Sequence, residues 1–211
     1  AATRPAAAPA SSKEVAHSRM DIALSILVTF LLTLVNGYFS MSEMALSTAR
    51  KVLLDHDAEE GDARAATAAD MIEDPTQFLA AIQVAITLVG FFSSAFAATS
   101  LSEPLGLWLS SFGMDVSIAN GLATVLITLI VSYFSIVVGE LVPKRIAMAD
   151  AEGVSKRVAG FLRGFSHAVK PLIWLTSASA NGIARLLHVK STEDRQEVSE
   201  DEIKYMVTDS D

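Results

Sequence analysis

The sequence contains no cysteine and is short of charged residues. Without cysteine, a disulfide framework, a thiolate metal site and a cysteine nucleophile are all excluded. Charged residues make up 19% of the 211 residues, whereas a typical soluble domain carries about 25%. The shortage is greatest in residues 77–142, whose only charges are Glu103, Asp115 and Glu140. An ordinary soluble globule is therefore excluded, and a hydrophobic content of 51% excludes a disordered chain.

Sequence signatures of enzymes and of nucleic-acid binding are also missing. The chain has no GxSxG, HExxH, GxGxxG or Walker-type loop. Its four histidines lie outside the most apolar stretches, whereas a Ser–His intramembrane hydrolase needs a histidine near a membrane-embedded serine. The net charge of −8 and the lack of a basic stripe with interleaved aromatics argue against nucleic acid. We therefore expect no enzymatic activity and no nucleic-acid partner.

Three stretches are long and apolar enough to cross a lipid bilayer, which takes about 20 residues of helix. They cover residues 22–45, 78–101 and 116–142. A fourth stretch, 161–187, is interrupted by Pro171 and by three basic residues. A central Lys or Arg costs about 2.5–3.5 kcal/mol on insertion scales. We expect this fourth stretch to lie at the cytoplasmic interface as a helix bent at Pro171, with a full fourth span as the alternative.

The distribution of charge predicts the orientation of these spans. Residues 46–76 hold three basic and eight acidic side chains, and residues 143–190 hold eight basic and two acidic ones. Positive charge beside a span stays in the cytoplasm. The third span should therefore end inside the cell, which places the N-terminus outside, the C-terminus inside and the loop 46–76 in the cytoplasm.

Shorter segments precede and connect the predicted spans. Residues 1–20 are rich in Ala, Pro and Ser, a composition typical of a disordered tail. The loop 46–76 predicts two short helices separated at Gly61. Asp74 and Pro75 are an N-cap residue and a first-turn proline, so the second spanning helix should begin there.

The last residues of the sequence are strongly acidic. Residues 191–211 carry eight acidic and two basic side chains, and Ser199 to Glu202 has the composition of a helix start. We expect a cytoplasmic domain to follow this acidic linker. The predicted organisation is an extracellular tail over 1–20, a three-span domain over 21–145, a juxtamembrane region over 146–190 and the linker over 191–211.

Glu140 is the first candidate for a functional residue, because ionisable side chains inside spans mark functional sites by default. Pro143 cannot donate a hydrogen bond to the carbonyl four residues earlier, that of Gly139. A carboxylate and a freed carbonyl therefore lie side by side, and hard cations prefer such oxygens. In the alternative, Glu140 ends the helix at the inner interface and pairs with Lys144 at i+4.

Polar residues in the first span are further candidates. Asn36 and Ser40 share one helix face, and Ser40, Ser42 and Glu43 follow closely in the sequence. A serine in a membrane helix is more often a small packing residue, or donates a hydrogen bond to a carbonyl of its own helix. Glu43 has two interpretations. Its side chain either lines the same polar cavity or extends to the cytoplasmic interface.

The second span carries one stripe of polar and small residues at spacings of four, three and four. Its members are Gln83, Thr87, Gly90 and Ser94. Such a stripe either packs helices closely or lines a polar path. If each span contributes its polar patch, the three helices can pool oxygens around one ion near the inner leaflet.

Two segments resemble the motifs of the CorC / cyclin M (CNNM) family, whose bacterial members are often labelled hemolysin-related. Phe39 to Leu46 (FSMSEMAL) is similar to the motif that ends the family's first transmembrane helix. Gly139 to Lys144 (GELVPK) is similar to the GE-x-x-PK motif that ends the third. The resemblance covers about residues 20–211, and it departs from the family where Ile86-Thr87 replaces a common Asn pair.

The resemblance implies an all-α membrane protein with three transmembrane helices, a juxtamembrane belt helix and a cytoplasmic acidic helical bundle. It implies a homodimer in the plasma membrane that exports Mg²⁺, with Na⁺ influx as a candidate driving force. Nucleotide would bind only through CBS modules that follow residue 211. The implied metal ligands are Ser40 or Ser42, helix-two oxygens at Thr87 and Gly90, and Glu140. The rival hypothesis is a non-transporting divalent-cation sensor, or a membrane anchor that regulates another protein.

Overall fold

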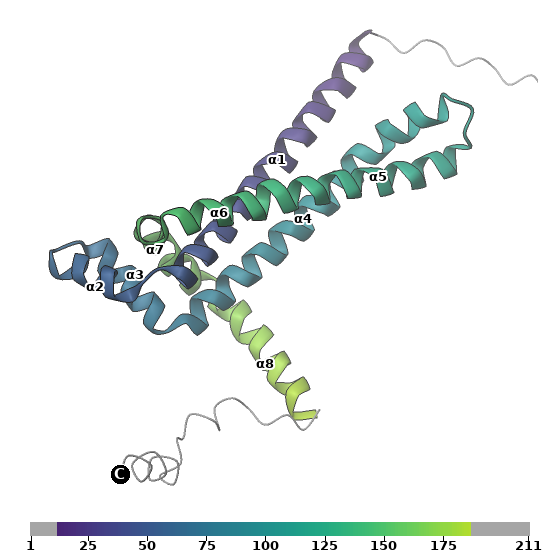
Figure 1. Ribbon diagram of the computed structural model, residues 1–211. Coiled ribbons are helices and arrows are strands. Elements are labelled where there is room, and N and C mark those ends of the chain that lie inside the picture. The colour runs from purple at the N-terminus through teal and green to yellow at the C-terminus, as the bar shows by residue number, and fades with distance from the viewer. Residues whose placement is uncertain (1–11, 187–211) are drawn as a thin grey trace, which may run out of the picture. The chain divides into compact units, whose positions relative to one another are not determined.

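The computed structural model describes residues 12–186, and the regular structure in that range is entirely helical. Three helices there are long and apolar enough to cross a membrane. They are α1 (Ser12–Thr48), α4 (Pro75–Ser110) and a continuous third helix. The third is built from α5 (Val116–Ile136), the π-helical turn η1 (Val137–Leu141) and α6 (Val142–Ala149). The predicted all-helical class and the three predicted spans are confirmed, and α4 lies against both α1 and α5 (Figure 1).

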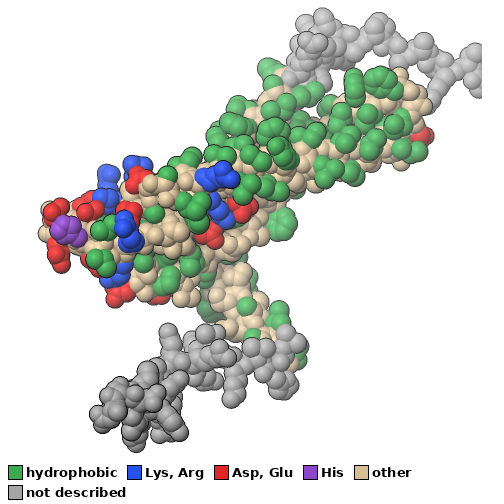
Figure 2. All heavy atoms as spheres, in the orientation of Figure 1, with side chains coloured by type: hydrophobic (Ala, Val, Ile, Leu, Met, Phe, Trp, Pro, Cys, Tyr) green, Lys and Arg blue, Asp and Glu red, His purple; other side chains and the backbone are tan. Residues whose placement is uncertain are grey.

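The apolar surface of the spanning helices faces outward, as a lipid environment requires. Only 11–28% of the most hydropathic part of each span is buried within the chain. Figure 2 shows hydrophobic side chains covering α1, α4 and α5, whereas acidic and basic side chains gather over α2, α3 and the adjoining helix ends. This division supports a membrane location for the three long helices.

The turn between the second and third spans is shorter than predicted. The apolar run was expected to end near residue 101, but α4 continues through Pro104 to Ser110 and leaves only 111–115 as the connection. The prediction was wrong here because packing against α5 keeps the chain helical past the proline. Asp115 then caps α5, accepting hydrogen bonds from the backbone of Ser117 and Ile118.

The charged end of the described chain consists of α2 (Lys51–Glu59), α3 (Ala63–Glu73) and α7 (Ala151–Ala168), packed against the ends of α1 and α4. The two predicted short helices are confirmed. Gly61 separates them with a φ of +102°, a conformation that favours glycine. As predicted, Pro75 is the first residue of α4, although the Asp74 side chain makes no capping hydrogen bond.

The core of this end is made of small and aliphatic side chains from these helices. Its fully buried members include Leu54, Ala65, Ala68, Ala159 and Leu162. Alanines on α3 let the neighbouring helices approach closely, and the aliphatic side chains of α2 and α7 fill the space between them. The alanine-rich composition of residues 63–69 is therefore a packing feature.

Ion pairs join the acidic α2–α3 segment to the basic α7. Lys156 Nζ lies 2.8 Å from Asp57 Oδ2 and 3.4 Å from Asp62 Oδ2, and its hydrogen bond to Asp57 raises the pKa of the lysine. The pKa of Asp62 is lowered, first by the backbone N–H of Arg64. Arg50 and Glu152 form a further pair at 2.9 Å. Acids of the 46–76 segment thus pair with Lys156 of α7, and Arg50 of that segment pairs with Glu152 of α7.

The final described helix, α8 (Lys170–Leu186), belongs to a separate compact unit and is described by itself. The predicted bend at Pro171 lies slightly earlier, because α7 ends at Ala168 and Pro171 occupies the first turn of α8, where a proline is tolerated. Within residues 12–186, α8 is not among the helices that qualify as membrane spans. The prediction of a disordered tail over 1–20 was wrong for residues 12–20, which form the start of the continuous helix α1. Residues 1–11 of that tail, and the acidic linker with its helix start, lie outside the described residues.

Candidate functional site

The third spanning helix changes its winding at the candidate site. Pro143 has no N–H to donate to the Gly139 carbonyl, and the five residues Val137–Leu141 form a π-helical turn. The backbone N–H of Val142 reaches back five residues to the Val137 carbonyl. The amide of Asn36 on α1 donates to the Gly139 carbonyl at 3.0 Å in a buried hydrogen bond. The carbonyl freed by the proline is therefore satisfied from another helix.

Two glycines bring α1 and η1 into direct contact at this point. A Cβ on Gly139 would lie 3.2 Å from Asn36 Nδ2 and 3.3 Å from the Thr33 carbonyl. A Cβ on Gly37 would lie 3.0 Å from Pro143 Cγ. All three distances are tighter than ordinary van der Waals contact. We call this contact, formed by residues 33–43 of α1 and residues 137–144, the α1–η1 junction.

The junction holds two buried polar oxygens that have no hydrogen-bond partner. Asn36 is 6% exposed and Ser40 is fully buried, and neither Asn36 Oδ1 nor Ser40 Oγ has a partner among the described residues. They lie on one face of α1 because they are four residues apart. A buried polar group without a partner costs about 1–3 kcal/mol. Oxygens of this neutral kind are ligands that Mg²⁺ and Na⁺ accept in proteins.

Charged side chains flank the junction. Lys144 Nζ lies 2.9 Å from Glu140 Oε1 and 3.5 Å from Glu43 Oε2. The pairing of Glu140 with Lys144 is the contact expected from the alternative interpretation of Glu140. Glu43 joins the same cluster through Lys144. The Glu140 side chain is 45% exposed, so its carboxylate lies at the edge of the buried region.

The other predicted ligands are not among the unpaired oxygens or the paired charges of the junction. The fully buried Ser42 donates to the Tyr38 carbonyl at 2.7 Å. Thr87 is exposed and donates to the Gln83 carbonyl at 2.8 Å, and Gly90 has no atom within 4 Å of a built Cβ. The structure therefore places Ser40 and Glu140 at the junction, whereas Ser42 and Thr87 bond their own helices.

Asn36 and Lys144 were named in the sequence analysis but were not among the predicted metal ligands. Their signals were the shared face of Asn36 and Ser40 and the i+4 spacing of Glu140 and Lys144. Within residues 12–186, no three His, Asp or Glu side chains lie close enough together to hold a metal ion. A cation at the junction would depend on neutral oxygens supported by one or two carboxylates.

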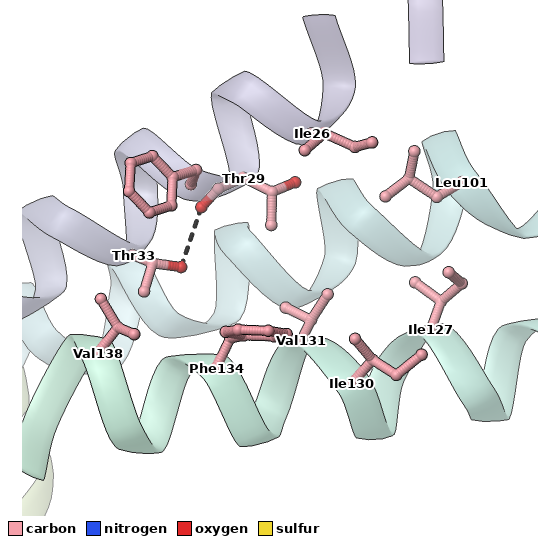
Figure 3. Close-up of a pocket in the computed structure, with 10 residues that line it drawn as sticks. Ile26, Thr29, Thr33, Leu101, Ile127, Ile130, Val131, Phe134 and Val138 are labelled. Atoms are coloured by element: carbon pink, nitrogen blue, oxygen red, sulfur yellow. Dashed lines mark hydrogen bonds between the residues drawn. The ribbon is translucent and has the colours of Figure 1, made fainter. Parts of the chain in front are cut away.

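An apolar cavity of about 350 Å³ lies between α1, α4 and α5 and adjoins the junction through Thr33 and Val138 (Figure 3). Its polar lining residues are Thr29 and Thr33, which donate to the Ser25 carbonyl at 2.8 Å and the Thr29 carbonyl at 3.0 Å. Both hydroxyl protons are therefore used within α1, and no charged side chain lines the cavity. The cavity offers two hydroxyl oxygens and no carboxylate, whereas the junction combines unpaired buried oxygens with the carboxylates of Glu43 and Glu140, so we take the junction as the candidate ion site.

Comparisons with known proteins agree with the motifs. The family described as Cyclin M transmembrane N-terminal domain matches residues 26–211. The chain is 33% identical over 187 residues to the UPF0053 protein sll0260 of Synechocystis, and this covers 89% of the chain. It is 28% identical over 183 residues to the Polyamine export protein of Escherichia coli K12, covering 87% of the chain. It spans only 40–42% of the length of these relatives.

The hydrogen bond between Asn36 and Gly139 can be tested with a double-mutant cycle. Asn36→Leu removes the donor from a buried carbonyl, so we expect it to lower the free energy of unfolding by about 1–3 kcal/mol. Pro143→Ala restores an N–H that can bond the Gly139 carbonyl within the helix. The cost of Asn36→Leu should therefore shrink in the Pro143→Ala background, as measured by unfolding of the protein in detergent.

The matched control is Asn181→Leu, the same exchange at an exposed position of α8. It should change the free energy of unfolding by no more than about 0.5 kcal/mol. If the costs of Asn36→Leu and Pro143→Ala simply add, Asn36 does not compensate for the missing N–H of the proline.

Proposed function

The chain belongs to the cyclin M transmembrane family, and from this premise we propose that it carries a cation across the membrane, with Mg²⁺ export as the first candidate function. The α1–η1 junction is the observation that carries the proposal. It holds two buried oxygens without partners, Asn36 Oδ1 and Ser40 Oγ, next to the segment that bears Glu140. The proposal assigns the chain ion transport and no enzymatic reaction.

The chemistry of the junction suits a small hard cation. Mg²⁺ binds six oxygens at about 2.0–2.1 Å and gives up its water reluctantly. Ser40, Asn36 and Glu140 would supply part of that shell, and retained water or oxygens of α4 would complete it. The contribution of α4 depends on the position where Ile86-Thr87 replaces the family's Asn pair. Thr87 is exposed in the single chain. Na⁺ remains the proposed coupling ion, since the same oxygens can hold it.

Polyamine export is a second candidate, favoured by two observations. Relatives 28% identical to the chain bear the name Polyamine export protein. In addition, the Lys144 ammonium already contacts the carboxylates of Glu43 and Glu140, so these side chains can hold a primary ammonium group. The non-transporting sensor or anchor is the alternative that flux measurements must separate from both.

Glu140→Gln should abolish saturable Mg²⁺ binding and Mg²⁺ flux while the protein keeps its fold. The reason is that the exchange removes the carboxylate that the third helix contributes to the junction and preserves the size of the side chain. Binding is measured by calorimetry, and flux with a Mg²⁺ indicator in liposomes that contain only this protein. Parallel assays with spermidine identify the transported cation.

Glu103→Gln is the matched control, because Glu103 is an exposed acid of α4 away from the junction. It should bind and transport like the unmutated protein. Unchanged Mg²⁺ affinity in Glu140→Gln would refute the assignment of Glu140. Binding without flux in the unmutated protein would favour the sensor.

We further propose that two copies associate through the outward face of α4. The stripe residues Gln83 and Thr87 are exposed in the single chain. A Cβ at Gly90, on this stripe, meets no atom of the same chain within 4 Å. The same is true of Gly121 on α5, which lies outside the stripe and serves as a control. Small residues on an exposed membrane helix allow close approach of a second helix.

Gly90→Leu should therefore convert the dimer into a monomer, since leucine fits the single chain but blocks the approach of the second. The mass of the protein in detergent is measured by light scattering. Gly121→Leu is the control and should remain dimeric. Monomeric unmutated protein, or dimeric Gly90→Leu protein, would contradict this interface.

We propose that α2 and α3 lie in the cytoplasm of a cell whose plasma membrane holds the protein. Because the chain has no cysteine, a single introduced thiol reports its own side of the membrane. An impermeant maleimide added to intact cells should label Ser111→Cys, in the α4–α5 turn, and spare Glu59→Cys until the cells are opened. Both positions are exposed. Labelling of Glu59→Cys in intact cells would reverse the orientation.

A further inference from the structure

Lys144 holds an unusual position at the α1–η1 junction. Its ammonium bridges two carboxylates on different helices, 2.9 Å from Glu140 Oε1 and 3.5 Å from Glu43 Oε2. The Lys144 and Glu43 side chains are each 29% exposed, so this contact is partly withdrawn from solvent. The lysine therefore occupies the carboxylate oxygens that a transported cation would need.

The surrounding groups indicate that this ammonium takes the place of another cation. Two carboxylates and one ammonium leave the cluster with a net negative charge. On α1, Asn36 Oδ1 and Ser40 Oγ are buried and accept no hydrogen bond from any described residue, Lys144 included. Lys144 thus pairs with both acids but donates to neither Asn36 Oδ1 nor Ser40 Oγ. A small cation that entered further into the junction could bind both the carboxylates and the neutral oxygens.

We propose that Lys144 is a tethered counter-ion that holds the Glu43 and Glu140 carboxylates while no transported cation is bound, and that it leaves them when the cation loads. This role rests on the proposed transport function and adds a mechanism to it. A divalent ion close to a bound ammonium meets strong like-charge repulsion, so the two exchange with each other. When the cation departs, the lysine returns to the acids and prevents them from recapturing the ion.

This exchange predicts opposite effects on binding and on turnover. Without the ammonium, a cation no longer competes for the carboxylates, so Lys144→Gln should bind Mg²⁺ more tightly. Partly exposed ion pairs are worth little, which limits the gain to about fivefold in Kd. The maximal flux should fall, because two uncompensated carboxylates release the ion slowly. A lysine that only anchored α6 to α1 would produce no gain in affinity.

The experiment compares four proteins as full chains: unmutated, Lys144→Gln, Lys144→Arg and Arg145→Gln. Calorimetry with MgCl₂ gives the affinity, liposome flux gives the maximal rate, and melting temperature in detergent reports the fold. Lys144→Arg keeps a tethered cation and should stay within about twofold of the unmutated affinity. Arg145→Gln removes the same charge from the adjacent, exposed position and should leave both quantities unchanged.

Tighter binding with slower flux in Lys144→Gln, and in that variant alone, would support the counter-ion role. Unchanged or weaker binding by a folded Lys144→Gln protein would overturn it, as would equal tightening in Arg145→Gln, which would reflect surface charge in general. If Lys144→Gln does not fold, a Lys144→Arg protein with a Kd lowered fivefold would equally overturn the role. Absence of saturable binding by the unmutated protein would refute the proposed transport function itself.

Discussion

The missing N–H of Pro143 is the constraint on which the membrane part of this structure depends. A carbonyl without a donor is costly in a bilayer, because no water is there to replace the lost bond. The side-chain amide of Asn36 on α1 supplies the missing donor and forms a hydrogen bond to the Gly139 carbonyl. That bond requires the close approach that Gly37 and Gly139 permit. It thereby fixes the register of α1 against the third helix and sets Glu43 opposite Lys144.

The charged end is held by different forces. There, alanines on α3 and aliphatic residues such as Leu54 and Leu162 form a close-packed core, and water is available to any unpaired backbone group. Ion pairs such as Lys156 with Asp57 add charge complementarity at modest individual strength. The spanning helices instead depend on close backbone contact and buried hydrogen bonds, because lipid removes the hydrophobic drive for helices to associate.

Hydropathy, proline and glycine patterns were sufficient to predict the three spans, the start of α4 at Pro75 and the break at Gly61. These features depend on local chemistry and on the surrounding lipid. The sequence also indicated that Pro143 frees the Gly139 carbonyl, but not that Asn36, 103 residues away, supplies the donor. Pro104 was expected to lie beyond the second span, yet packing on α5 keeps α4 helical to Ser110. The sequence also could not show that Thr87 faces outward. Periodicity identifies a stripe of residues on one helix face but not the helix or lipid that this face contacts.

Asn36 connects this structural account to the function. An amide has two donors and an acceptor oxygen, and only a donor is used, on the Gly139 carbonyl. An aliphatic side chain in this space would bring no unpaired amide oxygen into the membrane, but it would leave the Gly139 carbonyl without its donor. That oxygen and the Ser40 hydroxyl lack partners, as do buried oxygens elsewhere such as those of Ser93 and Asn120, but these two lie beside a carboxylate cluster. The two unpaired oxygens have a use if they bind a cation during transport. Asn36 would then both hold α1 against η1 and provide a ligand at the site.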